Sequence, residues 1–135
     1  ILDNAIKYSD AGTVISVEEF SYEFFSGIRI TDQGVGIAEE EIPLLFGRFY
    51  RGKTVHDKEG IGVGLYLARE IVEHNGGYIK VKSEVLKGST SVSYTHLTLS
   101  IYLRSRFCKD CGSKYCNIVR FEKESGKNNA ICWVL

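Results

Sequence analysis

Three residues near the start of the chain carry side chains suited to holding a nucleotide. Asn4, Lys7 and Tyr8 are spaced by three and four positions, which places them on one face of a helix. An amide oxygen is a hard ligand that suits Mg²⁺, a lysine supplies a point charge for phosphate, and an aromatic ring can stack on a base. The same triplet also fits an ordinary helix face with a solvated lysine, so on its own it leaves both interpretations open.

Two glycine-rich segments offer backbone that a ligand can approach closely. Asp32 opens the sequence DQGVG, where Gly34 and Gly36 permit positive φ and the carboxylate can accept a hydrogen bond from an exocyclic amine. The sequence GIGVGL, residues 60–65, leads directly into a helical pattern, so its N–H groups predict a phosphate cradle. A plain turn and a flexible hinge are the respective alternatives, and neither segment matches the dinucleotide fingerprint or the P-loop.

Hydrophobic periodicity predicts the elements that position these residues. Helices are expected at residues 1–8, 38–46 and 62–74, and strands at residues 13–20, 24–31 and 78–83. The last helix has an apolar stripe of Leu65, Ala68, Ile71 and Val72. Residues 47–61 follow neither period and predict a mobile loop. Together the segments predict helices layered against a mostly antiparallel sheet.

Composition limits the class of protein. The chain has 135 residues with 17 basic and 17 acidic side chains, and this zero net charge disfavours binding to nucleic acid through a basic face. Hydrophobic residues make up 44% and charged residues 25%, as in globular domains. No run approaches the roughly 18 apolar residues of a membrane span, so we expect no direct membrane contact by this segment. Methionine is absent and Ile1 already lies in a patterned segment, so we expect a fragment.

Taken in order, the motifs resemble the ATP-binding domain of bacterial sensor histidine kinases. The resemblance rests on the Asn/Lys/Tyr helix, DQGVGI, FGRFYRG at residues 46–52, GIGVGLYLARE, GGYIKV and KGST, and it covers residues 1–90. It implies a two-layer α/β sandwich of Bergerat type, with a mixed, mostly antiparallel sheet and helices on one face, incomplete at its N-terminus. Type II topoisomerases, mismatch-repair ATPases and a heat-shock chaperone share this superfamily.

The resemblance also implies roles for single residues. Asn4 would ligate Mg²⁺, Lys7 would contact phosphate, and Asp32 would accept the adenine amine. Arg51 would reach the γ-phosphate from a lid at residues 47–59, where Arg48 and Lys53 are further cations. Asn4, Lys7 and Arg51 form the expected catalytic set. The expected nucleotide-binding set is Asn4, Lys7, Tyr8, Asp32, Gly34, Gly36, Ile37, Phe49, Arg51, Gly60, Gly62, Val63, Gly64 and Leu65.

The function implied by the resemblance is transfer of the γ-phosphoryl group of Mg·ATP to a histidine. That histidine would lie on a dimerisation domain absent from this chain, and a response regulator would be an indirect partner. The domain itself would be cytoplasmic. None of His56, His74 and His96 has a context resembling the acceptor, so we expect the fragment alone to be inactive. An ATP hydrolase of the topoisomerase or mismatch-repair type, usually acidic where Lys7 stands, and a non-catalytic nucleotide-binding module are the alternatives.

The end of the chain departs from the family. Residues 91–135 begin with SVSYTHLTL, which resembles a translated sequencing adapter and lacks the family's closing-strand pattern. We therefore expect a separate, non-family tail whose first strand is short or irregular. The spacing of Cys108, Cys111, Cys116 and Cys132 lacks a second CxxC, which disfavours a zinc site. A disulfide is disfavoured as well, because we expect a cytosolic protein. Smaller departures are Ile61 in place of threonine and Gln33 in place of asparagine.

Overall fold

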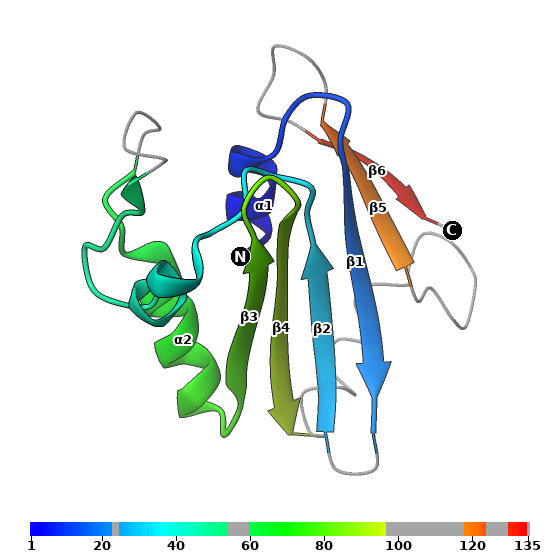
Figure 1. The fold of residues 1–135 in the computed structure, drawn as a ribbon. Coiled ribbons are helices and arrows are strands. Elements are labelled where there is room, and N and C mark those ends of the chain that lie inside the picture. Colours follow the sequence, from blue (N-terminus) through cyan, green and yellow to red (C-terminus); the bar gives the residue numbers. More distant parts are fainter. Residues whose placement is uncertain (23–24, 54–59, 97–117, 124–129, 135) are drawn as a thin grey trace.

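The structure, a computed structural model, is described for residues 1–22, 25–53, 60–96, 118–123 and 130–134. Its centre is a six-stranded sheet in the order β3-β4-β2-β1-β5-β6, in which each neighbouring pair is antiparallel (Figure 1). The strands are β1 (Val14–Ser21), β2 (Phe25–Thr31), β3 (Tyr78–Glu84), β4 (Gly88–His96), β5 (Ile118–Lys123) and β6 (Ala130–Val134). The helical elements are α1 (Leu2–Tyr8), the 3₁₀ helix η1 (Glu39–Leu44) and α2 (Gly64–His74). This arrangement confirms the predicted α/β class.

Alternation along the strands gives the sheet one apolar face. The pairing places Val17 opposite Ile30, and Ile15 on the same face has no exposed surface. Burying a side chain of this size stabilises the fold by about 1.5–3 kcal/mol. Helix α1 packs on β2, while η1 and α2 pack on β3. We call this side the helix-covered face; it carries Ile15, Val17, Ile28, Ile30, Ile79 and Val81.

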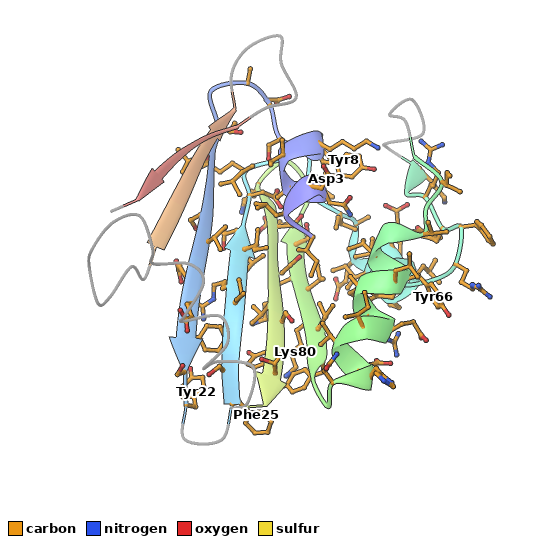
Figure 2. The ribbon with its side chains drawn as sticks, turned by 180° about the vertical axis from the view of Figure 1, so that it is seen from behind. Asp3, Tyr8, Tyr22, Phe25, Tyr66 and Lys80 are labelled. Carbon is orange, nitrogen blue, oxygen red and sulfur yellow. The ribbon has the colours of Figure 1, made fainter. Side chains whose placement is uncertain are left out.

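The opposite face of the sheet carries aromatic and charged side chains. Phe20, Tyr94 and Tyr78 occupy one row across the strands, and the last two rings stack with centroids 4.4 Å apart. Lys80 lies on this face with its ammonium over the Tyr78 ring, 5.4 Å from the ring centroid. Figure 2 places Tyr22 at the end of the sheet farthest from α1. The motifs that the sequence analysis links to nucleotide binding lie on the helix-covered face, beside Ile30 and Val81.

The helical elements differ from the sequence prediction in three details. Residues 38–46 were expected to form a short helix, and the structure has a 3₁₀ helix at Glu39–Leu44. Pro43 lies inside it and has no N–H to donate, which disfavours the α-helical ladder. Helix α2 begins at Gly64, two residues later than expected. Ile71 was predicted to be on the buried stripe of α2, but it is 63% exposed, so the stripe narrows to the half-buried Leu65, Ala68 and Val72.

The prediction of an irregular strand after Thr90 is wrong for residues 91–96. Strand β4 pairs without interruption with β2 on one side and β3 on the other. Its backbone N–H and C=O groups therefore find hydrogen-bond partners along both edges. Its register puts Ser91, Ser93 and Thr95 on the helix-covered face, and Val92 and Tyr94 on the opposite face. Regular pairing thus does not require an apolar pattern on the covered side.

The rest of the predicted tail is described only in part. Strand β5 joins the sheet beside β1, and β6 pairs with β5. Three of the four cysteines, Cys108, Cys111 and Cys116, lie outside the described residues, as does His56. The division of the chain at residue 90 stays a prediction.

Candidate nucleotide-binding site

A cavity of about 370 Å³ lies between α1, η1, the residues before α2 and the helix-covered face of the sheet. It brings together residues that are far apart in the sequence, because α1, the turn after β2 and the segment before α2 all contribute to its lining. The members of the predicted binding set that line it are Asn4, Lys7, Tyr8, Asp32, Gly36, Ile37, Arg51, Gly60, Gly62, Val63, Gly64 and Leu65.

Asp32 is held in place by the backbone at one end of this cavity. Its Oδ1 accepts hydrogen bonds from the backbone N–H of Gly34 at 2.9 Å and of Ser89 at 3.1 Å. Both of these hydrogen bonds use Oδ1. Among the described residues no donor reaches Oδ2, which can therefore accept a hydrogen bond from a ligand. Burial raises the pKa of the Asp32 carboxyl from its usual 3.8, and the two backbone hydrogen bonds oppose that shift.

Gly36 is required because its backbone packs closely against the end of β3. Its φ is +71°, and a β-carbon there would overlap the carbonyl group of Glu84. The next residue, Ile37, donates its backbone N–H to Ser83 Oγ at 2.8 Å. Ser83 Oγ also lies 2.9 Å from Ser89 Oγ, so the two serines connect the DQGVG turn to β3 and β4. Ser89 belongs to the KGST motif that supported the family resemblance, whereas no sequence pattern indicated Ser83.

The other end of the cavity is formed by the start of α2. The helix has Val63 at its N-cap position and no acidic residue in its first turn, and no side chain in the described part of the chain caps it. Its first N–H groups and the helix dipole together favour an anion. Lys7 brings a cation to this segment. Its Nζ lies so close to Gly60 that a β-carbon at that position would be 3.1 Å from it. This geometry suits a phosphate chain.

Residues 50–53 approach the glycine-rich segment from the side of η1. Gly62 has a φ of +74°, and a β-carbon there would come within 2.6 Å of the Tyr50 carbonyl oxygen. Tyr50 and Arg51 both line the cavity. Arg48 does not line it, since its guanidinium lies 5.0 Å from the Tyr66 ring centroid on α2. Arg51 is therefore the arginine of the FGRFYRG motif that the structure brings to the cavity.

Two residues of the predicted binding set do not line the cavity. Phe49 is 67% exposed and has a φ of +62°, which is unusual for a residue other than glycine. Gly34 lies behind the cavity wall, where its N–H supports Asp32. The lining also includes Glu41, a buried carboxylate that the sequence analysis did not select.

Asn4 lines the cavity on α1, and its amide oxygen is a hard donor that Mg²⁺ accepts. Mg²⁺ usually keeps several waters and is bound through one or two protein ligands, most often carboxylates, together with the phosphates of a nucleotide. Among the described residues, no group of three or more histidine, cysteine, aspartate or glutamate side chains could hold a metal by itself. Tyr8 extends from the same helix, α1, and is labelled in Figure 2.

Known proteins share this arrangement of sequence and fold. The family model described as histidine kinase-, DNA gyrase B-, and HSP90-like ATPase matches residues 1–101. The chain belongs to this family. Within it, the chain is 43% identical over 91 residues to the signal transduction histidine-protein kinase ArlS of Staphylococcus aureus, in strains that include USA300 and MRSA252.

The match to ArlS covers 66% of this chain and 20% of the relative, so the chain spans about a fifth of the length of these curated proteins. A solved structure, the mycobacterial sensor histidine kinase MprB, has a TM-score of 0.66 and 30% identity, covering 70% of this chain and 66% of that one. The chain is thus a histidine-kinase-type ATPase domain in sequence and in fold. No helix in the described part of the chain is long and apolar enough to cross a membrane.

Proposed function

We propose that this ATPase-family domain binds Mg·ATP and transfers the γ-phosphoryl group to a histidine of a dimerisation domain. The observation that carries the proposal is that one cavity is lined by Asn4, Lys7 and Asp32 together with Arg51 and the start of α2. In this assignment Asp32 accepts the adenine amine and Tyr8 forms a wall of the base pocket.

The chemistry would consist of positioning and charge neutralisation. Lys7, Arg51 and the first N–H groups of α2 would bind the phosphate oxygens and offset their negative charge. Bound Mg²⁺, held by Asn4, would supply further neutralisation of the triphosphate. The acceptor nitrogen forms a bond to the γ-phosphorus as the bond to the bridging oxygen of ADP breaks, so no covalent nucleophile is needed within this domain.

The acceptor histidine is proposed to come from a second domain, and the exposed side of α2 supports a protein partner. Leu67 and Ile71 are one turn apart on that helix and are 51% and 63% exposed. Contiguous exposed apolar surface marks sites of protein interaction, and side chains four positions apart on a helix are neighbours. A response regulator would then receive the phosphoryl group from the dimerisation domain rather than from this chain.

Phosphotransfer in trans tests the proposal. The chain is incubated with radiolabelled Mg·ATP, with and without a separately purified dimerisation domain of a sensor histidine kinase. We expect acid-labile label on the added domain and none on His56, His74 or His96 of this chain. The variant Asp10→Asn, on an exposed turn, is a control that should behave like the wild type. ATP hydrolysis without transfer would favour an ATP hydrolase, and binding with neither reaction would favour a nucleotide-binding module.

A further inference from the structure

Glu41 is a buried carboxylate for which the proposed function has no role. It lies on η1 and is 7% exposed, whereas its neighbours Glu39 and Glu40 are exposed. Removing a charged group from water costs free energy unless the group finds hydrogen-bond partners. A carboxylate buried beside a phosphate site therefore calls for a specific reason.

Among the described residues, both hydrogen-bond donors to Glu41 come from the segment that carries Arg51. The Tyr50 hydroxyl donates to Glu41 Oε1 at 3.2 Å, and the Lys53 backbone N–H donates to the same oxygen at 3.0 Å. The two donors lie on either side of Arg51 in the sequence. One oxygen atom thus fixes both ends of residues 50–53, and Arg51 lines the cavity between them.

The Tyr50 hydroxyl remains a hydrogen-bond donor at neutral pH. Burial raises the pKa of the Tyr50 hydroxyl above its ordinary 10.0, and the hydrogen bond and the negative charge of Glu41 raise it further. The Tyr50 carbonyl in turn packs against Gly62, where a β-carbon would come within 2.6 Å of it. Residues 50–53 are therefore held on one side by Glu41 and on the other by the glycine-rich segment.

We infer that Glu41 is a positioning residue for triphosphate binding, holding residues 50–53 so that Arg51 faces the phosphate chain. The inference rests on the proposed function, because it assigns the phosphates to the end of the cavity where Arg51 lies. Glu41 itself touches no phosphate in this role. Its two donors compensate its charge, and its effect on the ligand passes through Arg51.

Comparison of two ligands separates this role from general support of the fold. ATP uses both ends of the cavity, whereas adenosine uses only the end at Asp32. For Glu41→Ala we expect affinity for Mg·ATP to fall about tenfold and affinity for adenosine to change less than about twofold. Glu41→Gln keeps an oxygen that can accept both hydrogen bonds, so it should restore most of the Mg·ATP affinity. Glu40→Ala removes an exposed charge from the same helix and is the matched control.

Calorimetric titration of the full chain with both ligands measures these affinities. Combining Glu41→Ala with Arg51→Ala should weaken Mg·ATP no more than Arg51→Ala alone, because both changes remove the same contact. If Glu41→Ala does not fold, Tyr50→Phe removes one of the two hydrogen bonds and should still weaken Mg·ATP about threefold without affecting adenosine.

Three results would overturn the inference: equal losses for ATP and adenosine, unchanged affinity for both, or losses from Glu41→Ala and Arg51→Ala that multiply in the double variant. A failure of the proposed function is a different result. If the wild-type chain binds no ATP, both proposals are rejected, whereas ATP binding that is insensitive to Glu41 rejects only the positioning role.

Discussion

The two ends of the cavity are built by different physical means. At one end, the Asp32 carboxylate is fixed by two backbone hydrogen bonds, from Gly34 and from Ser89 on β4. At the other end, no side chain among the described residues caps the start of α2, and the nearby cations Lys7 and Arg51 lie on long side chains. The first end presents one acceptor in a fixed direction, and the second presents several donors whose positions can adjust.

This difference matches what each part of a nucleotide requires. A base is recognised by the direction of a few hydrogen bonds, so an acceptor held rigidly by the sheet can discriminate between bases. A phosphate chain is recognised mainly by charge, which acts over longer distances and in many geometries. Changes at the Asp32 end should therefore alter which base binds, and changes at the α2 end should alter how binding depends on charge and metal.

The largest expected effect is an exchange of base preference at Asp32. Asp32→Asn keeps Oδ1 for the backbone bonds but replaces Oδ2 with an NH₂ group, which opposes the adenine amine. We expect ATP affinity to fall by about 1–3 kcal/mol, the cost of an unmatched buried polar group. Inosine triphosphate has a carbonyl in place of the amine, so the variant should bind it better than the wild type does.

Competition titrations of ATP against inosine triphosphate measure this exchange. Asp10→Asn makes the same chemical change at an exposed turn and should leave the preference for ATP unaltered. An Asp32→Asn variant that loses affinity for both nucleotides equally would show that Asp32 supports the fold of the site without reading the base.

A smaller effect, specific to metal, is expected at Asn4. Removing the amide with Asn4→Ala should weaken Mg·ATP about tenfold, because the metal loses its protein ligand. Binding of ATP in the presence of a chelator should change little. Parallel titrations with Mg²⁺ and with chelator make the comparison, and equal losses in the two would remove Asn4 from the set of ligands.

Much of this site could be predicted from the sequence, because its glycines and polar residues occur in compact motifs. Asp32, Gly60 and Lys7 each stand in a pattern whose local geometry is constrained. Glu41 could not be found in this way, since its contact with Tyr50 depends on how a 3₁₀ helix and the following loop fold together. Only the structure shows which of three successive glutamates is buried.

The strands, too, could be predicted from the sequence only in part. Alternating apolar residues predicted β1 and β2 within about one residue of their ends, because one face of each is buried. Strand β4 was misjudged, since serine and threonine residues occupy its covered side and backbone pairing on both edges keeps it regular. Exposure of Ile71 was also missed, because periodicity shows which residues share a face of a helix but not how wide the covered stripe is.

The smallest expected effect is a dependence of stability on pH that comes from Asp32. Burial raises the pKa of its carboxyl above 3.8, so the folded chain holds this proton more tightly than the unfolded chain does. The stabilising contribution is therefore complete below the unfolded value and is lost as pH rises through the raised pKa. Without nucleotide, the free energy of unfolding of the wild type should fall relative to that of Asp32→Asn across this range, as measured by denaturant titration at several pH values. A relative rise with pH would mean that the two backbone hydrogen bonds outweigh burial, and that the fixed acceptor is stabilised in its charged form before any base arrives.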